Sequence, residues 1–279
     1  MSPTALRSIL FVPATRPERI VKALDSEADA VIVDLEDAVA EGDKPAARKA
    51  LDAFLSDNPQ VRLMVRVNAP GTDHCALDLA LCARHAAVSR VVVPKAETAP
   101  ALEHAARCNK PLWPLIETAR GLLALPSLVH VAGVERLCFG ALDMSAELGL
   151  MPGTAGAGQI LDHSRYQLLV YSRAARLLPP IESPHPAIDD IQAVAQAAMR
   201  AKHMGFSGML CIHPKQLSPI NQAFSPTETE LAWASKIIEM ANQHEGAFSV
   251  DGQMVDAPVI ARAKGILSSA AAKSNRRPR

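Results

Sequence analysis

The chain has 279 residues, and because 49% of them are hydrophobic and 21% charged, its composition favours a folded globular protein over a disordered one. Lysine and arginine together number 29, as do aspartate and glutamate, so the formal net charge is +0. This balance gives no reason to expect a nucleic-acid partner or an acidic membrane surface. The length is sufficient for one large domain or two small ones.

Five cysteines are scattered through the sequence without a C-x-x-C pair. An odd and dispersed set is typical of reduced thiols rather than of a disulfide framework or a structural zinc. A strand-like run begins directly after Arg7, so we expect no signal peptide. The longest apolar stretch, residues 121–134, is interrupted by Pro126 and His130 and is too short to span a bilayer. We therefore predict a cytoplasmic protein without a membrane partner.

Eight short apolar runs recur along the chain, and most are rich in β-branched residues, which is typical of strands buried on both faces. They are residues 8–12, 30–34, 63–67, 90–94, 112–116, 136–139, 179–182 and 208–212. Helix-like segments alternate with them at residues 17–26, 44–55, 76–87, 100–108, 121–132, 161–177 and 187–204. The seventh run is the least regular, because Pro179, Pro180, Pro184 and Pro186 crowd it.

Strands that alternate with helices predict βα units on a parallel sheet, and eight such units predict a (β/α)8 TIM barrel. A doubly wound open sheet is the alternative. After residue 212 the pattern changes to a helix over residues 227–243, a hairpin-like segment over 246–256 and a final helix over 258–271. We therefore divide the chain into a barrel catalytic domain (1–222), a C-terminal lid with helices that pack on a neighbouring subunit (223–272) and a disordered basic tail (273–279).

Two acidic residues, Glu117 and Asp143, each end an apolar run in front of small residues. Packing does not explain a carboxylate at the end of a strand that is buried on both faces. If both strands belong to one parallel sheet, the two carboxylates emerge at the same edge, where paired oxygen donors can hold a hard divalent cation. The sequence therefore predicts a metal-assisted enzyme.

A second acidic group follows the second strand, where Asp34, Glu36 and Asp37 place three carboxylates within four residues. Three such charges repel one another and need a cation, helix N-terminal amides or an arginine nearby. Arg66 ends the third strand, where a buried guanidinium must face an anion and can hold a carboxylate with two parallel hydrogen bonds. We expect these groups to lie at the same end of the barrel as Glu117.

Several basic residues remain open to two interpretations. Lys95 follows the fourth strand and could form a Schiff base, but pairing with the nearby acids is the favoured interpretation. Arg16, Arg19 and Lys22 follow the first strand and could bind the phosphates of a nucleotide-like carrier or simply form helix surface. His213 ends the last strand and is expected to be structural.

Taken together, these segments resemble the citrate lyase β-subunit-like proteins of the HpcH/HpaI aldolase superfamily, over about residues 7–265. The matching pieces are Leu10-Phe11-Val12-Pro13, Asp34-Leu35-Glu36-Asp37-Ala38-Val39, Lys44 with Arg48, Arg66-Val67-Asn68, Pro94-Lys95, Ile116-Glu117-Thr118-Ala119, Gly140-Ala141-Leu142-Asp143, Cys211-Ile212-His213-Pro214 and residues 251–258. The Pro-rich seventh strand departs from the acid-containing pattern of the family.

The resemblance implies a (β/α)8 barrel that forms a homotrimer or a hexamer. It implies Mg2+ on Glu117 and Asp143, and substrate binding by Arg66. It implies a CoA thioester near Arg16, Arg19 and Lys22, and we add Phe11 to the residues that bind substrate or cofactor.

The resemblance also implies that Asp256 reaches the active site of a neighbouring subunit. We assign it proton transfer, and we assign Glu36 and Asp37 the task of holding water and the arginine in position. The hypothesis is a lyase that cleaves a 3-hydroxyacyl-CoA to acetyl-CoA and a 2-oxo acid, with citramalyl-CoA first, malyl-CoA second and citryl-CoA or citryl-acyl-carrier-protein third. A malyl-CoA thioesterase is an alternative, as are a 2-oxo-acid aldolase without CoA and a catalytically silent CoA-binding scaffold.

Overall fold

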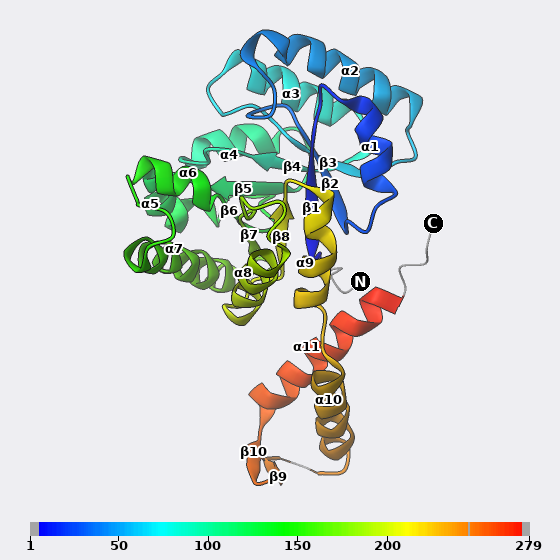
Figure 1. Cartoon of the computed structure of the whole chain (residues 1–279), viewed down its shortest axis with the longest axis vertical. Coiled ribbons are helices and arrows are strands. Elements are labelled where there is room, and N and C mark those ends of the chain that lie inside the picture. The colour runs from blue at the N-terminus through cyan, green and yellow to red at the C-terminus, as the bar shows by residue number, and fades with distance from the viewer. Residues whose placement is uncertain (1–5, 245, 275–279) are drawn as a thin grey trace.

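The computed structural model describes residues 6–244 and 246–274, and its centre is a closed parallel barrel of eight strands in the order β1 to β8 (Figure 1). The strands are β1 (Ser8–Pro13), β2 (Ala30–Asp34), β3 (Leu63–Arg66), β4 (Val88–Val93), β5 (Leu112–Ile116), β6 (Cys138–Phe139), β7 (Ile181–Glu182) and β8 (Gly208–Cys211). Because β1 pairs with both β2 and β8, the barrel has no free edge. The predicted (β/α)8 barrel is confirmed, and the open sheet is excluded.

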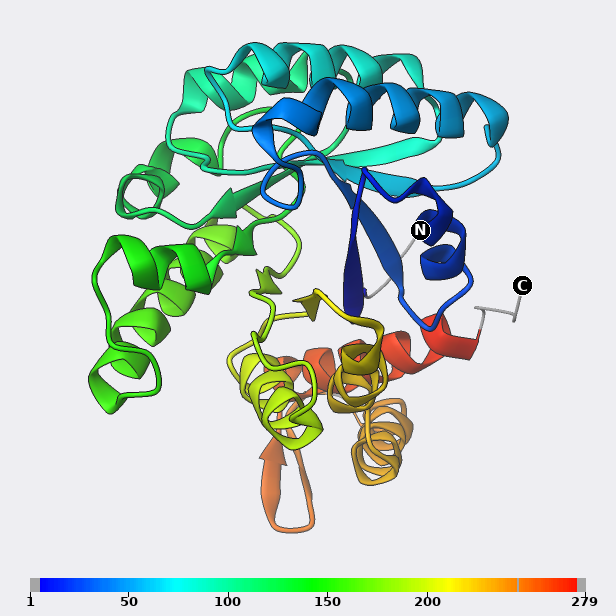
Figure 2. The ribbon, with the colours of Figure 1, turned by 45° about the horizontal axis from the view of Figure 1, so that its top comes forward.

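Helices surround the barrel and cover its outer surface (Figure 2). They are α1 (Pro17–Leu24), α2 (Lys44–Asp57), α3 (Asp73–Arg84), α4 (Ala99–Ala106), α5 (Ala119–Leu128), α6 (Ala141–Glu147), α7 (Ala155–Ala174), α8 (Ile191–His203) and α9 (Leu217–Phe224), with 3-10 turns η1 (Glu41–Asp43) and η2 (Pro214–Gln216). Threonine side chains cap several of them: Thr72, Thr98, Thr118 and Thr154 each accept a hydrogen bond from a backbone N–H in the first turn.

Side chains that alternate along the strands divide the core into two layers. Every strand contributes at least one buried residue to the interior cluster, which comprises Ile9, Ile32, Met64, Val92, Trp113, Leu115, Cys138, Ile181 and Leu210. A larger cluster of buried apolar residues lies between the strands and the helices. Burial of this apolar surface is the main stabilising contribution to the barrel.

The same alternation decides which residues face the mouth of the barrel. Side chains two residues apart lie on the same face of a strand. The residue two positions after the last interior residue of each strand therefore also faces inward, at the carboxyl end of the barrel. These positions are Phe11, Asp34, Arg66, Pro94, Glu117, Gly140, Ser183 and Ile212. The predicted cluster of charged residues at the strand ends is therefore a consequence of strand periodicity.

Three local expectations need correction. β7 is only two residues long, because Pro179 and Pro180 cannot donate to a strand ladder. α7 begins at Ala155, ahead of the predicted residue 161, since Thr154 caps it. Asp143 does not follow a strand directly: β6 ends at Phe139, Gly140 caps α6, and Asp143 lies in the first turn of that helix.

Glu182 of β7 turns away from the barrel interior, where Ile181 points inward. Its carboxylate accepts hydrogen bonds from Arg165 of α7, at 2.8 Å from Nε and 3.0 Å from Nη2. This bidentate pair attaches α7 to the short strand. The acid of the divergent seventh strand therefore has a structural partner outside the barrel.

A C-terminal arm projects from the barrel (Figure 1) and consists of α10 (Glu228–Ala241), β9 (Phe248–Val250), β10 (Gln253–Val255) and α11 (Ala257–Ser274). Asp251 and Gly252, both with positive φ, form the two-residue turn of the hairpin. A separate small core, which includes Ala234, Ile237 and Val255, holds the arm together.

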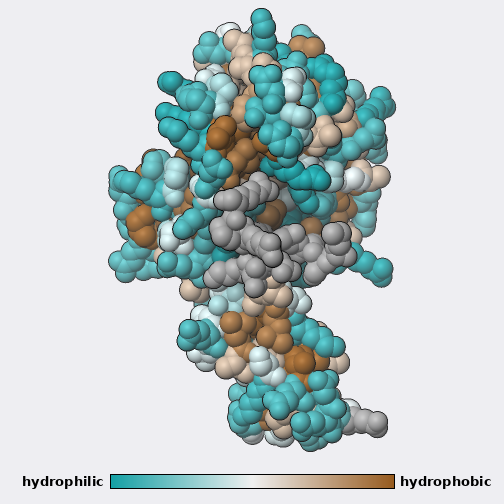
Figure 3. All heavy atoms as spheres, turned by 90° about the vertical axis from the view of Figure 1, so that its right-hand side faces the viewer, coloured by the Kyte–Doolittle hydropathy of each residue, from teal (hydrophilic) through white to brown (hydrophobic). Residues whose placement is uncertain are grey.

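The arm carries the segment that the sequence predicts as a lid. α11 continues to Ser274, and residues 275–279 of the predicted basic tail lie outside the described residues. In Figure 3, apolar side chains gather on the exposed face of the arm below the barrel. Across residues 6–244 and 246–274, no helix combines the length and apolar character that crossing a membrane requires.

Candidate active site

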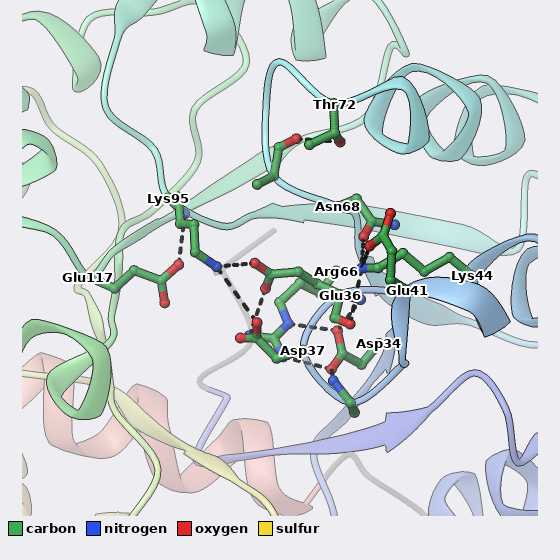
Figure 4. Close-up of polar contacts among 12 residues, drawn as sticks. Asp34, Glu36, Asp37, Glu41, Lys44, Arg66, Asn68, Thr72, Lys95 and Glu117 are labelled. Carbon is green, nitrogen blue, oxygen red and sulfur yellow. Dashed lines mark hydrogen bonds and ion pairs between the residues drawn. The ribbon is translucent and has the colours of Figure 1, made fainter. Parts of the chain in front are cut away.

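Arg66 and Asp34 form the centre of the charged cluster at the barrel mouth (Figure 4). The parallel register places the two residues opposite each other at the ends of β3 and β2. Arg66 donates from Nε to Asp34 Oδ1 at 2.7 Å and from Nη2 to Oδ2 at 2.6 Å. Only 9% of Arg66 and 1% of Asp34 are exposed, so the pair is removed from water and little screened by salt.

The third nitrogen of Arg66 faces the two remaining acids of the β2–α2 loop. Nη1 lies 3.2 Å from Glu36 Oε2 and 3.3 Å from Asp37 Oδ2. Burial lowers the pKa of Arg66, but hydrogen bonds and charge from Asp34, Glu36 and Asp37 outweigh it and raise the pKa above its usual value. Arg66 therefore stays charged, and the arginine that the sequence predicts as compensation for the three acids is present.

Phe11 supports this arrangement from β1. The guanidinium of Arg66 lies over the Phe11 ring, 4.8 Å from the ring centre. An aromatic face attracts a cation and also fixes the plane of the guanidinium. Phe11, predicted among the ligand-binding residues, thus lies at the barrel mouth in contact with Arg66.

Glu117 follows β5 and is buried, with 1% of its surface exposed. Its Oε1 accepts a hydrogen bond of 2.7 Å from the backbone N–H of Lys95. Its Oε2 is buried without a hydrogen-bond partner. The pKa of Glu117 is raised to about 8: burial is the largest cause, the charges of Glu36 and Asp143 also raise the pKa, and Lys95 opposes the shift. A buried carboxylate oxygen without a partner is costly unless a cation or a proton satisfies it.

Asp143 is exposed in the first turn of α6, close enough to Glu117 for its charge to affect the pKa of that residue. The two carboxylates fit a Mg2+ ion, which takes one or two protein carboxylates and keeps several waters. Among residues 6–244 and 246–274 no group of three or more His, Cys, Asp or Glu side chains is arranged as a metal cage. A ready-made site for a metal with many protein ligands is therefore absent from that part of the chain.

Lys95 connects the Arg66 cluster to Glu117. Its ammonium donates a hydrogen bond to Glu36 Oε1 and lies 3.7 Å from Asp37 Oδ1. Burial lowers the pKa of Lys95, but the Glu36 hydrogen bond and the surrounding carboxylates outweigh this and raise it. A protonated amine in an ion pair is not a nucleophile, so the geometry favours the predicted pairing with acids over a Schiff base.

A buried network behind β3 was not recognised from the sequence as part of the site. Asp78 of α3, which is fully buried, accepts hydrogen bonds from Asn68 N at 2.9 Å, Asn68 Nδ2 at 2.6 Å and Arg48 Nε at 2.5 Å. Lys44 donates to Asn68 Oδ1 and, at 3.4 Å, to the carbonyl of Glu36. The network therefore ties the loop that carries Glu36 to the segment after Arg66. The signal in the sequence was the pair Lys44 and Arg48 one helical turn apart.

The three predicted basic residues of the first loop are on or next to α1. Arg16 precedes the helix, and Arg19 and Lys22 follow at intervals of three residues, which places them along one side. All three are exposed, and Arg16 has Glu18 at 4.0 Å as an ion-pair partner. The structure thus leaves these cations available at the surface.

Asp256 is not brought to Glu117 within one chain. It directly follows β10 at the far end of the arm, while Glu117 belongs to the barrel (Figure 1). Its carboxylate is partly buried and accepts a hydrogen bond of 3.4 Å from Val259 N at the start of α11.

His213, as expected, has a structural role, because its side chain accepts from Lys215 N and caps η2.

Comparison with known proteins adds to this geometry. The citrate lyase subunit beta-like protein of Mycobacterium tuberculosis is 38% identical, and the match covers 94% of each chain. The (3S)-malyl-CoA thioesterase of Cereibacter sphaeroides is 31% identical over 95% of each chain, and the mitochondrial citramalyl-CoA lyase of Rattus norvegicus is 26% identical over 95% of this chain and 86% of the relative.

A solved structure of similar fold is that of protein CitE from Mycobacterium tuberculosis in complex with magnesium, acetoacetate and coenzyme A. It is 36% identical, with a TM-score of 0.85, and the match covers 96% of this chain and 98% of CitE. The family described as HpcH/HpaI aldolase/citrate lyase matches residues 7–214. The resemblance read from the sequence motifs is therefore confirmed, and the chain is an enzyme that belongs to the HpcH/HpaI aldolase/citrate lyase family.

Proposed function

We propose that this enzyme cleaves a 3-hydroxyacyl-CoA to acetyl-CoA and a 2-oxo acid, with Mg2+ bound by Glu117 and Asp143. The observation that carries the proposal is the buried, unpartnered Oε2 of Glu117 at the mouth of a barrel that also presents the charged Arg66. The relative CitE, which was solved with magnesium, acetoacetate and coenzyme A, supports this choice of metal and thioester.

The chemistry needs two kinds of positive charge near the reacting oxygens. Mg2+ at Glu117 would supply Lewis-acid stabilisation of negative charge on a substrate oxygen. Arg66, fixed by Asp34 and by the ring of Phe11, adds a second positive charge without having to reorganise. Overall the reaction breaks one carbon–carbon bond and moves one proton from the hydroxyl oxygen to the methylene carbon that becomes the methyl group of acetyl-CoA.

Proton transfer at that carbon is assigned to Asp256 of a neighbouring subunit in a homotrimer or hexamer. Asp256 lies on the arm and cannot reach Glu117 of its own chain in this structure (Figure 1). The exposed apolar side chains of the arm support packing against a second copy, because such patches on soluble proteins commonly mark contact surfaces (Figure 3). Under this proposal the arm is the predicted lid.

The phosphates of CoA are assigned to Arg16, Arg19 and Lys22. These residues line the start of α1, directly after β1, at the same end of the barrel as Arg66. Three exposed cations on one side of a helix attract a polyanion and increase its rate of association at low salt. Glu36 and Asp37 are assigned to hold Arg66 and water in place.

The preferred substrate is citramalyl-CoA, which gives pyruvate, followed by malyl-CoA, which gives glyoxylate, and then citryl-CoA or citryl-acyl-carrier-protein, which gives oxaloacetate. Hydrolysis of malyl-CoA is the second candidate function, since the 31% identical relative from Cereibacter sphaeroides is a (3S)-malyl-CoA thioesterase. A thioesterase would attack the thioester with water and release CoA without breaking a carbon–carbon bond.

The test incubates the purified protein with Mg2+ and each of the three CoA thioesters and separates the products by chromatography. A lyase yields acetyl-CoA and a 2-oxo acid in equal amounts, whereas a thioesterase yields free CoA and the hydroxy acid. Glu117→Gln, which keeps the size of the side chain, is the control for metal dependence. Release of neither 2-oxo acid nor CoA from any substrate would contradict both candidate functions. Absence of thermal stabilisation by CoA would favour an aldolase that acts on free hydroxy acids.

A further inference from the structure

Lys95 has a backbone conformation that its residue type seldom adopts. Its φ is +45°, in the left-handed region. This conformation is unfavourable for non-glycine residues, so it persists only where the surroundings enforce it. Across the described ranges 6–244 and 246–274, the others are Asn109 and Arg176, which follow helices, and Asp251, in the arm hairpin. Lys95 is the one at the mouth of the barrel.

The unusual conformation lets one residue contact two different groups of acids (Figure 4). The backbone N–H of Lys95 points to Glu117 and donates the 2.7 Å hydrogen bond to Oε1. The side chain runs the other way and places its ammonium on Glu36, with Asp37 at 3.7 Å. The backbone of Lys95 therefore holds Glu117, the candidate metal ligand, in position. The side chain of Lys95 offsets the negative charge of the acids around Arg66.

The charges at the mouth show why the ammonium matters. Asp34, Glu36 and Asp37 carry three negative charges, and Arg66 alone supplies one positive charge against them. The net charge of these four residues is −2, and with the Lys95 ammonium it is −1. A carboxylate substrate that approaches Arg66 meets this surplus, and the charge of Glu36 also acts on Glu117. The net charge of the group thus affects anion and cation binding in opposite directions.

We propose that Lys95 is a positioning residue that separates the two carboxylate groups: its N–H orients Glu117 toward the cation, and its ammonium keeps Glu36 and Asp37 on the Arg66 side so that an anionic substrate can bind. This inference rests on the proposed function, because it takes Mg2+ and a 2-oxo acid as the ligands. It assigns Lys95 no covalent or proton-transfer step.

Loss of the Lys95 ammonium should change the affinities for Mg2+ and for the anionic substrate in opposite directions. Removal of the ammonium leaves the N–H bond to Glu117 in place and adds net negative charge, so cation binding should strengthen while anion binding weakens. At an effective dielectric constant of about 20, one unit charge several ångströms away changes each affinity by roughly tenfold, and less where solvent screens it. Loss of folding or of backbone geometry would instead weaken both ligands together.

The experiment measures Mg2+ binding to the metal-free protein, and pyruvate binding to the Mg2+-saturated protein, by isothermal titration calorimetry. Lys95→Met removes the charge but keeps most of the length, and Lys95→Arg retains the charge. Lys95→Gly removes the charge and also relieves the left-handed conformation, since glycine adopts positive φ freely. Thermal unfolding of each variant shows whether it is folded.

The expected result is that Lys95→Met and Lys95→Gly both bind Mg2+ several-fold more tightly and pyruvate roughly tenfold more weakly than the wild type. Lys95→Arg should stay near the wild type in both. Equal affinities in all variants would overturn the proposal, and so would a parallel loss of both ligands in Lys95→Met. Failure of the wild-type protein itself to bind Mg2+ or pyruvate would contradict the proposed function, and the inference with it.

Discussion

Gly140 faces Glu117 so closely that a side chain at position 140 would collide with it: a methyl group there would lie 2.8 Å from Oε2, the oxygen that has no partner. The φ of Gly140 is −111°, which any residue can adopt, so the requirement for glycine is one of space. The residue that caps α6 and precedes Asp143 thus also leaves the room in which Glu117 can hold a cation.

Gly140→Ala should weaken Mg2+ binding by roughly 10- to 100-fold, because the added methyl group displaces the Glu117 carboxylate. Titration calorimetry with Mg2+ measures the loss directly, independently of turnover. Gly156→Ala is a matched control: nothing lies within 4 Å of a Cβ at that position in α7, and alanine is the better helix former. Wild-type Mg2+ affinity in Gly140→Ala would show that Glu117 is not the ligand.

Arg66→Lys tests the pair of parallel hydrogen bonds that Arg66 donates to Asp34. Lysine keeps the positive charge but cannot donate to Oδ1 and Oδ2 in parallel, and it lacks the planar contact with Phe11. Pyruvate affinity should fall roughly 10- to 100-fold, while Mg2+ affinity stays near that of the wild type. Arg107→Lys, an exposed position at the end of α4, serves as the control substitution. If Arg66→Lys binds pyruvate normally, Arg66 does not contact the substrate.

Complementation between subunits tests the assignment of Asp256. Asp256→Ala should keep Mg2+ binding and thermal stability but lose turnover. Glu117→Gln should lose turnover because it no longer binds Mg2+. When the two variants are co-expressed with different tags and purified as mixed assemblies, about a third of the wild-type turnover should return for a homotrimer, since each mixed trimer has one of its three neighbouring pairs in the required order; for a hexamer the fraction is about a quarter. Inactive mixed assemblies would show that Asp256 does not act across a subunit boundary.

Glu135 gives a pH-dependent prediction far from the mouth. Burial raises the pKa of Glu135, but hydrogen bonds from Arg90, at 2.5 and 3.1 Å, and from Trp113, at 2.7 Å, outweigh it and hold the pKa below the usual 4.5. A carboxyl whose folded pKa is lowered stabilises the protein above pH 4.5, and this contribution disappears as the pH falls through the folded pKa.

Glu135→Gln should therefore lower the free energy of unfolding at pH 7 by about 1–2 kcal/mol. The difference from the wild type should shrink as the pH is lowered below about 4. Urea unfolding at a series of pH values measures both. A difference that is constant from pH 7 to pH 3 would show that the charge of Glu135 makes no contribution. Because Glu135 precedes β6 on the side opposite the mouth, turnover at pH 7 should not change.

Much of the barrel could be predicted from the sequence because strand periodicity is a local property. Runs of β-branched residues separated by helical segments located all eight strands, and the residues two positions beyond the interior side chains include Asp34, Arg66 and Glu117. The seventh strand was harder to locate, since its prolines leave only Ile181 and Glu182 to pair. The start of α7 was misplaced because the cap at Thr154 precedes several glycines.

The sequence by itself determined the family, the barrel and the set of charged residues at the strand ends, because each depends on residue types and spacings along the chain. Only the tertiary structure decided which charges meet: Arg66 is held by Asp34, Lys95 joins Glu36 to Glu117, and Gly140 provides space for Glu117. These contacts join residues that are 22 to 59 positions apart in the chain, and the pairing of parallel strands in register brings them together, so no local pattern could reveal them.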